Sequence, residues 1–338
     1  MSRVLVTGAT GFIGGHLAKH LLERKETVVG ILHDIKPFYT ANLLGIDDKV
    51  IWAKGDITDG EFVKRVVAEY EVEKIYHVAA LPIVRVGTKT TVPIFQANTM
   101  GTLNIFEAAK EHKLSGYDVH VLYMSTDKVY GHGGYKPYLE GSPLNGYGIY
   151  ECSKACGDLI ARAYFFNYDV KTVIVRGSNI YGPADLNSRI IPNTIRRCLR
   201  GLSPLVYKGI TYVREFTHVD DACRAIVTLM EGIPKICAYG DLDPDNPESR
   251  HLITNKLAFN VGSGVSKDQQ ETISEILKHF PGMKPTYVDP QPYMAKEIPY
   301  QTLDSSKIRE AYGWKPQVSF EKGIEGVVAW WREHQDIW

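Results

Sequence analysis

The stretch Thr7–Gly15, TGATGFIGG, decides the fold of this 338-residue chain. It follows a short β-branched run, Arg3–Val6, and opens a helical pattern. Gly8, Gly11 and Gly14 are spaced so that the chain can turn tightly, its N–H groups can approach a pyrophosphate, and the helix can pack closely on the strand. A glycine-rich turn without a ligand is the alternative, but the position between a strand and a helix favours a dinucleotide site.

Outward from this loop, short β-branched runs alternate with amphipathic helical patterns, which is typical of a parallel sheet covered on both faces. The expected strands are Arg3–Val6, Thr27–Leu32, Val50–Lys54, Lys74–Val78, His120–Met124 and Thr172–Arg176. The longest expected helices are Val92–His112 and Gly148–Tyr168. We therefore expect an α/β protein with a doubly wound parallel sheet, a Rossmann fold, and a smaller C-terminal substrate-binding lobe.

A carboxylate stands where the second expected strand ends, at His33-Asp34. Asp34 would accept hydrogen bonds from an adenosine ribose and repel a 2′-phosphate, which favours NAD. The neighbouring His33 and Lys36 keep NADP open as the less favoured cofactor, and a turn-capping Asp is the plainer alternative. Asp56 and Ile57 end the next strand, where they could hold the adenine, although Asp56 could equally cap a helix.

The regular alternation ends near residue 180, where Pro and Gly become frequent. We expect residues 1–179 to form the NAD-binding Rossmann domain and residues 180–338 to form mainly the substrate-binding lobe. Later strands near 210–230 and at 258–262 are candidates to rejoin the first domain. The polar stretch Tyr239–Arg250 is rich in turn residues and is expected to be a surface excursion.

Composition excludes several classes of function. Lys+Arg and Asp+Glu both number 39, so the net charge is zero, which argues against nucleic-acid binding and against a polybasic membrane surface. No apolar run reaches the roughly 18–20 residues of a membrane-spanning helix. The five cysteines are scattered without a CxxC pair, and the histidines lack an HxxxH pattern. We expect a cytoplasmic protein without disulfides and without a metal ion.

Two groups of side chains indicate chemistry. Tyr150 and Lys154 are four residues apart on an expected helix, so they share one face, and the lysine would lower the pKa of a tyrosine that acts as a base. Thr126, Asp127 and Lys128 follow a central strand at its carboxyl end, where ligands of open α/β sheets bind. A surface Tyr–Lys pair and an Asx-type turn with an exposed lysine are the alternatives.

Taken together, these residues resemble the extended short-chain dehydrogenase/reductase family of NAD-dependent nucleotide-sugar epimerases and dehydratases. The resemblance covers nearly the whole chain. The motifs occur in family order: TGATGFIGG, GDITD, HVAAL (His77–Leu81), ANTMGT (Ala97–Thr102), YECSK, RGSNIYGP (Arg176–Pro183), REFTHVDD (Arg214–Asp221), FNVGSG (Phe259–Gly264) and GWKP (Gly313–Pro316). The resemblance implies a tightly held, recycled NAD.

It also implies roles for individual residues. Tyr150 is the base, Lys154 binds the nicotinamide ribose, and Ala79 and Ala80 line the cofactor channel. The other cofactor-binding positions implied are Gly8, Thr10, Gly11, Phe12, Ile13, Gly14, Asp34, Asp56, Ile57 and Asn98. The implied substrate-binding positions are Arg85, Asn179, Arg189 and Arg214. Helices Val92–His112 and Gly148–Tyr168 would pair with a second subunit in a four-helix bundle, although burial within one chain is the alternative.

The triplet Thr126-Asp127-Lys128 is the most discriminating feature within the family. Four-epimerases usually have a small hydroxyl residue followed by other small residues here, and dTDP-glucose dehydratases have Thr-Asp-Glu. The CDP-glucose type has Asp-Lys, and so do dehydratases that act on UDP-N-acetylglucosamine. The segments LPIVRVG (Leu81–Gly87) and QTLDSSKIREAYGW also resemble CDP-glucose 4,6-dehydratases. The continuation DKVYGHGG and the stretch 239–250 depart from that pattern, which leaves the nucleotide base and the hexose open.

The resemblance therefore implies a lyase, a sugar-nucleotide 4,6-dehydratase. Tyr150 would take the C4 hydroxyl proton as hydride leaves C4, and the ketone would acidify the C5 proton. Neutral Lys128 would remove that proton, protonated Asp127 would protonate the departing C6 hydroxyl, and hydride would return to C6. A 4-epimerase, in which Asp127 and Lys128 are only turn residues, is the first alternative. A non-catalytic NAD-binding regulator is the second.

Overall fold

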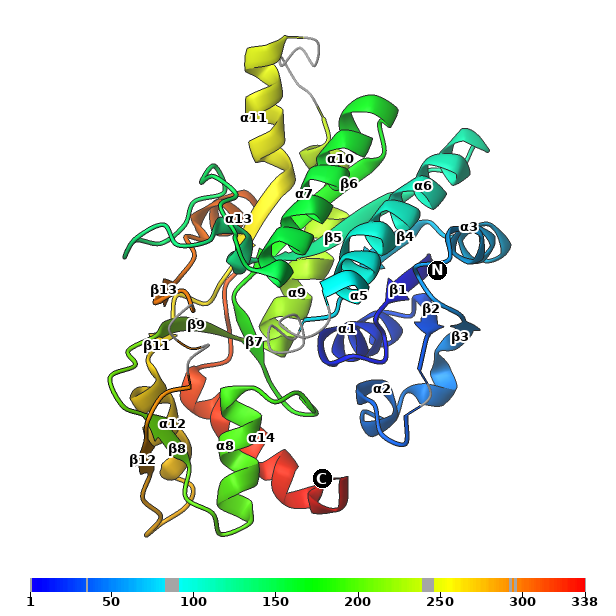
Figure 1. Ribbon diagram of the computed structural model, residues 1–338. Helices are drawn as coiled ribbons and strands as arrows, with labels where there is room; N and C mark the ends of the chain where they lie inside the picture. Colours follow the sequence, from blue (N-terminus) through cyan, green and yellow to red (C-terminus); the bar gives the residue numbers. More distant parts are fainter. Residues whose placement is uncertain are drawn as a thin grey trace.

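A seven-stranded parallel sheet forms the centre of the computed structural model, which describes residues 2–34, 36–82, 91–238, 246–291, 294 and 297–337 (Figure 1). In spatial order its strands are β10 (Ala258–Val261), β6 (Lys171–Gly177), β5 (His120–Thr126), β4 (Lys74–His77), β1 (Arg3–Thr7), β2 (Thr27–Leu32) and β3 (Ile51–Lys54). Successive strands are added on one side of β1 up to β3 and on its other side from β4 onward, so the strand order reverses between β1 and β4. Ligands of such sheets bind at this switch point, beyond the carboxyl ends of the strands.

The strands are continuous apolar runs because both faces of the sheet are covered. Val4, Leu5 and Val6 in β1 have no exposed surface, and β5 and β6 are buried along almost their whole length. This pattern is typical of parallel strands between two helical layers. The expected doubly wound sheet is confirmed, and all six expected strands occur in it.

Helices cover both faces of the sheet (Figure 1). One layer contains α3 (Gly60–Glu69), α6 (Gly101–Leu114) and α7 (Ile149–Tyr168), with α5 (Thr91–Phe95) and the π-helical turn η2 (Gln96–Met100) leading into α6. The other layer contains α1 (Phe12–Glu23), α9 (Val219–Glu231) and α10 (Ile233–Ile236). Short elements complete this part: α2 (Thr40–Leu43) and the 3₁₀ turns η1 (Asp47–Lys49) and η3 (Asp127–Tyr130).

The C-terminal lobe is built on small sheets and helices. Its strands are β7 (Asn179–Tyr181), β8 (Leu205–Tyr207), β9 (Val213–His218), β11 (Ser266–Lys267), β12 (Thr286–Val288) and β13 (Tyr300–Gln301). Its helices are α8 (Ile190–Leu199), α12 (Gln269–Leu277), α14 (Phe320–Glu333) and the turn η5 (Gln335–Ile337), whereas α13 (Ser306–Tyr312) packs on β10 of the large sheet. A separate apolar core centred on Trp331, Phe216 and Phe320 holds the lobe together.

One of the two strands expected to rejoin the large sheet does so, and the other does not. Residues 258–261 form β10, which pairs in parallel with β6. The strand near 210–230 is β9, and it lies in the small sheet because its edges are taken by β7, β11 and β13. The helix that follows it, α9, is the part that returns to pack on β5 and β6.

The expected surface excursion at Tyr239–Arg250 is corrected in its second half. Residues 239–245 lie outside the described residues, but Pro247 begins α11 (Pro247–Leu257). The side chain of Asn246 caps this helix by accepting a hydrogen bond from the N–H of Glu248 at 3.0 Å. Proline at the first helical position suits its missing N–H, so the same residues that suggested a turn start a helix. Among the described residues, no helix is long and apolar enough to span a membrane.

Candidate active site

The glycine loop between β1 and α1 is shaped for a close-lying ligand. Gly8 has a positive φ of 72°, and the N–H of Gly11 donates to its carbonyl at 2.8 Å. A Cβ on Gly14 would lie 2.1 Å from the Gly8 oxygen, so only glycine permits this packing of helix on strand. The N-terminal N–H groups of α1 face the loop, which suits a pyrophosphate.

Two adjoining cavities flank the loop and contain most of the expected cofactor residues. The first, of about 310 Å³, is lined by Thr10, Gly11, Phe12, His33, Asp34, Lys36, Phe38, Tyr39, Thr40, Leu186 and Asn187. The second, of about 270 Å³, is lined by Gly8, Thr10, Ile31, His33, Asp56, Ile57, Thr58, Ala79, Ala80, Leu81, Pro93, Gln96 and Ala97. Ile13 instead packs against the large core. The cavities and the glycine cradle fit a dinucleotide.

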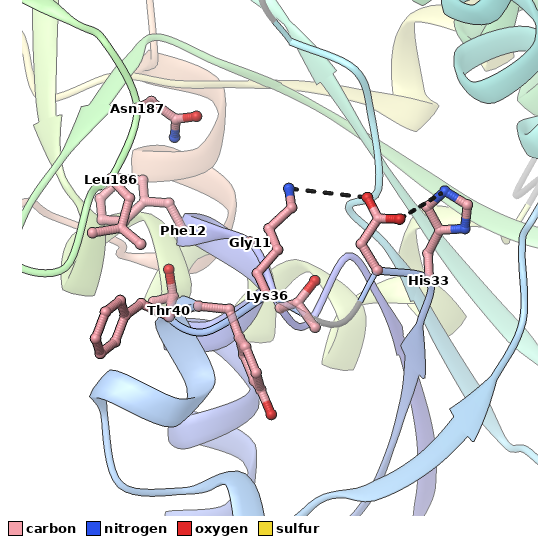
Figure 2. Close-up of a pocket in the computed structure, with 11 residues that line it drawn as sticks. Gly11, Phe12, His33, Lys36, Thr40, Leu186 and Asn187 are labelled. Atoms are coloured by element: carbon pink, nitrogen blue, oxygen red, sulfur yellow. Dashed lines mark ion pairs between the residues drawn. The ribbon is translucent and has the colours of Figure 1, made fainter. Parts of the chain in front are cut away.

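The Asp34 carboxylate lies between the side chains of His33 and Lys36, both of which Figure 2 labels. Its oxygens lie 3.6 Å from Nε2 of His33 and 4.0 Å from Nζ of Lys36. The other ring nitrogen of His33 lies 3.5 Å from the carboxylate of Asp56. His33 therefore links the two acidic residues expected on either side of the adenosine, a link that sequence reasoning did not find.

Tyr150 and Lys154 occupy the first turns of α7, at the carboxyl edge of β5. The ammonium of Lys154 donates to the Met124 carbonyl at 2.6 Å and lies 4.3 Å from the ring centre of Tyr123. Burial lowers the pKa of Lys154 to about 7. Burial likewise raises the pKa of Tyr150 to about 12, against the opposing effect of Arg189 and of a hydrogen bond with Thr126. The expected lowering of the Tyr150 pKa by Lys154 is not seen, since burial raises that pKa and the groups that oppose the rise are Arg189 and Thr126.

Asp127 is the least satisfied charged group of the site. It is only 3% exposed, and its Oδ1 accepts a hydrogen bond from the Thr126 hydroxyl at 3.0 Å. Its Oδ2 is buried without a hydrogen-bond partner. Burial raises the pKa of Asp127, although Lys128 and Arg214 oppose the shift. A buried acid with a free oxygen is suited to donate a proton.

Lys128 is paired with a residue that sequence reasoning missed. Its Nζ lies 3.3 Å from the carboxylate of Glu297, which also accepts from Arg214 at 3.4 Å. Burial by itself would raise the pKa of Glu297, but the two cations together lower it. Lys128 is therefore not an exposed turn residue. No motif spacing could have revealed Glu297, since 169 residues separate it from Lys128.

The remaining expected substrate residues lie on the lobe side. Asn179 in β7 donates to the carbonyl of Glu215 at 3.3 Å, and Arg189 donates to the carbonyl of Ile180 at 3.1 Å at the start of α8. Arg85 lies outside the described residues. Asn98 is buried, and its amide is bonded to Leu81 and Ser153, so it shapes the cofactor loop from behind.

A dinucleotide-type sheet, a glycine cradle and a Tyr–Lys pair on one helix define an extended short-chain dehydrogenase/reductase. The family model described as GDP-mannose 4,6 dehydratase matches residues 5–327, and the chain belongs to this family. The sequence-based assignment to nucleotide-sugar dehydratases of this type is confirmed.

Individual relatives agree with that family. A dTDP-glucose 4,6-dehydratase of Actinoplanes sp. is 28% identical over 345 residues, covering 99% of both chains. The low-salt glycan biosynthesis protein Agl12 of Haloferax volcanii is 31% identical over 329 residues, 96% of this chain and 97% of its own. The crystal structure of the dTDP-glucose 4,6-dehydratase DesIV from Streptomyces venezuelae, with NAD bound, superposes with a TM-score of 0.84 at 28% identity, covering 99% and 98% of the two chains.

Proposed function

We propose that this protein is an NAD-dependent sugar-nucleotide 4,6-dehydratase, a lyase that converts an NDP-hexose to an NDP-4-keto-6-deoxyhexose. The observation that carries the proposal is the buried Asp127, with one unpartnered oxygen and a raised pKa. Elimination of a C6 hydroxyl needs such an acid, whereas a 4-epimerase does not. The dTDP-glucose 4,6-dehydratases among its relatives support the same reaction class.

The glycine cradle, Asp34, Asp56 and the Ala79–Ala80 segment would hold NAD. When bound, NAD supplies a hydride acceptor and a positive charge. Tyr150 takes the C4 hydroxyl proton, and its neighbours Thr126 and Arg189 favour the tyrosinate that this requires. Lys154, with a pKa of about 7, is easily converted between its charged and neutral forms at neutral pH.

Elimination across C5 and C6 uses the other side of the cleft. Protonated Asp127 donates its proton to the C6 hydroxyl, which leaves as water. Neutral Lys128, 3.3 Å from Glu297, removes the C5 proton and returns it to C5 when hydride is delivered to C6. Arg214, which shares Glu297 with Lys128, and Asn179 and Arg189 hold the diphosphate.

Single-turnover experiments with a panel of NDP-hexoses test this division of labour. Tyr150→Phe should lose about 10²–10⁴ in the rate of oxidation, so little NADH forms. Asp127→Asn should oxidise the sugar but not dehydrate it, so NADH accumulates. A product of unchanged mass with a new sugar would instead indicate a 4-epimerase. No turnover with any sugar nucleotide would indicate an NAD-binding regulator.

We also propose that the protein is a cytoplasmic homodimer that pairs through a four-helix bundle. Large apolar side chains are exposed along the helices expected to pair: Val92, Met100, Leu114, Leu159 and Tyr168. Sedimentation of the wild type and of Leu159→Lys tests the interface. We expect a dimer for the wild type and a monomer for the variant. A monomeric wild type at micromolar concentration would refute the proposal.

A further inference from the structure

A chain of buried hydrogen bonds runs behind the site, from the end of β1 to the first turn of α7. Its members, in order, are Thr7, His77, Thr102, Asn98, Ser153 and the backbone of Tyr150. Apart from Tyr150, none of these residues is more than 1% exposed. Buried polar groups without partners cost about 1–3 kcal/mol each, so the directions of these bonds are strongly constrained.

The constraint begins at Thr7. Its hydroxyl oxygen accepts the N–H groups of Val78 and Ala79, at 3.1 and 3.0 Å, which uses both lone pairs. Its hydrogen must therefore point to Nδ1 of His77, at 2.8 Å. A neutral imidazole that accepts at Nδ1 carries its hydrogen on Nε2, which then donates to the Thr102 hydroxyl at 2.9 Å.

The chain continues in one direction from Thr102. The Thr102 hydroxyl donates to the backbone carbonyl of Asn98 at 2.6 Å, and Asn98 lies within the π-helical turn η2. The Asn98 amide accepts from the N–H of Leu81 at 2.7 Å and donates to the Ser153 hydroxyl at 3.0 Å. The Ser153 hydroxyl donates to the Tyr150 carbonyl at 2.8 Å. Every side chain in the series thus has its donor and acceptor satisfied by a neighbour.

Burial, assisted by the charge of Lys154, lowers the pKa of His77 to about 3. The ring therefore stays neutral at any working pH, and it acts neither as an acid nor as a base. It also lies behind the cavities, since it is completely buried and neither cavity includes it. Its contribution must come through the segments that it joins.

The segments that His77 joins all belong to the proposed cofactor-binding and catalytic site. Thr7 precedes the glycine cradle, Leu81 follows the Ala79–Ala80 wall of the second cavity, and Tyr150 is the base. We propose that His77 is a positioning residue, which through Thr102, Asn98 and Ser153 fixes the first turn of α7 relative to the cofactor loop. The proposal rests on the NAD-dependent oxidation proposed above, and it predicts an effect on the rate of that oxidation rather than on substrate affinity.

The first test is a double-mutant cycle of Thr102→Val and Ser153→Ala, which break the chain at two places. NADH formation is measured in a single turnover at saturating substrate. Each single variant should slow it about tenfold, because small misplacements of reacting groups are costly, while KM changes little. If the chain acts as a unit, the double variant is no slower than the slower single variant. Multiplicative losses, or wild-type rates in both single variants, would overturn the proposal.

Substitutions of His77 distinguish the effect of its hydrogen bonds from the effect of its volume. The amide nitrogen of glutamine can occupy the place of Nε2 and donate to Thr102, whereas leucine cannot. His77→Gln should therefore form NADH faster than His77→Leu. The two variants should have the same Tm, which shows that the rate difference does not come from unfolding. Equal rates would show that His77 only fills space. Thr172→Val is the matched control: it removes a completely buried hydroxyl, which donates to the Val170 carbonyl at 2.7 Å, at the amino end of β6 away from the site. It should leave NADH formation unchanged.

A second measurement does not depend on turnover. In ¹⁵N spectra of the histidine-labelled protein, His77 should show an unprotonated Nδ1 and a protonated Nε2 that do not titrate between pH 8 and about 5. Thr102→Val should shift the Nε2 signal. The opposite tautomer, or titration in this range, would overturn the assignment of the chain. If the wild type forms no NADH with any sugar nucleotide, the proposed oxidation fails, and these spectra still decide whether the hydrogen-bond chain exists.

Discussion

The charges of Lys128, Glu297 and Arg214 show how single residues define this cleft. Two cations share one carboxylate, and both cations contact it within 3.4 Å. Glu297 holds Lys128 and Arg214 together at this end of the cleft, and its substitution gives a direct test of that arrangement.

Glu297→Gln keeps the shape of the side chain but removes the charge that holds Lys128 and Arg214. We expect NADH to form at nearly the wild-type rate, while elimination slows on the order of 10²-fold because Lys128 is misplaced, so that NADH accumulates during a single turnover. Glu69→Gln, which removes an exposed carboxylate that pairs with Arg65, is the control and should change neither step. Normal release of the 4-keto-6-deoxy product by Glu297→Gln would rule out its role.

A second prediction concerns the cofactor carboxylate. Asp34→Ala removes the negative charge between His33 and Lys36 and leaves these two side chains near the expected position of a 2′-phosphate. We expect the ratio of NADP affinity to NAD affinity to rise at least tenfold, as measured by calorimetric titration of both cofactors. Asp289→Ala, which removes an exposed carboxylate that pairs with Lys208 in the lobe, is the control. An unchanged ratio would show that Asp34 does not contact the ribose.

Sequence reasoning located residues whose role depends on local spacing. The glycine cradle, Asp34 and the Tyr150–Lys154 pair each depend on one turn, one strand end or one helix face, and local rules describe those well. Glu297 could not be found in this way, because it meets Lys128 only when the lobe folds against the large sheet. The His33 link between Asp34 and Asp56 also depends on the separation of two strand ends that sequence does not give.

At the scale of elements, the close contact between α7 and β5 positions the catalytic residues. The Tyr123 hydroxyl in β5 donates to the carbonyl of Lys154 at 3.0 Å, one turn before Gly157. A Cβ at Gly157 would lie 2.1 Å from that hydroxyl oxygen. The absence of a side chain at Gly157 therefore sets the distance of the helix from the sheet.

Gly157→Ala should push α7 from β5 and destabilise the protein by about 1–3 kcal/mol, the usual cost of overpacking. It should also slow NADH formation, because both Tyr150 and Lys154 move with the helix. Gly326→Ala is the matched control, since nothing lies within 4 Å of its Cβ position in α14. That change should stabilise the protein by about 0.5–1 kcal/mol. Urea unfolding measures both; equal effects would contradict the packing argument.

Helices and strands were predicted best where the hydrophobic pattern is long and regular. The expected helix Val92–His112 is present but interrupted by the π-helical turn η2, which places Asn98 against Leu81 and Ser153. Periodicity over the whole stretch does not locate such a wide turn, because the residues on either side of it still follow a helical pattern. The strand β9 was detected as a strand, yet its sheet depends on long-range pairing with β7, β11 and β13.

In the whole molecule, the site lies where the lobe meets the large sheet. The sheet side supplies the cofactor cradle, Asp127 and the catalytic helix. The small sheet supplies Arg214 from β9, and Glu297 precedes β13, which pairs in parallel with β9. The acid and the base proposed for elimination, Asp127 and Lys128, thus come from the sheet side, whereas the ion pairs that hold Lys128 in place come from the lobe.

The burial of Lys154 predicts how the free energy of unfolding of the whole protein depends on pH. In the folded state burial lowers the pKa of Lys154 to about 7, whereas the value for an unburied lysine is 10.5. Between these values the unfolded chain binds a proton that the folded protein does not. The free energy of unfolding therefore rises by about 1.4 kcal/mol per pH unit between pH 7 and 10.5, and the destabilisation caused by this group is fully present below pH 7.

Lys154→Met removes that contribution. The free energy of unfolding of the variant minus that of the wild type should be largest near pH 7. This difference should fall by about 1.4 kcal/mol per pH unit up to pH 9. Urea unfolding at several pH values measures the difference. Lys284→Met, which replaces an exposed lysine, should show a difference that is independent of pH. If the difference between Lys154→Met and the wild type is also independent of pH, the Lys154 ammonium stays charged in the folded protein. The lysine would then act on Tyr150 purely as a fixed positive charge.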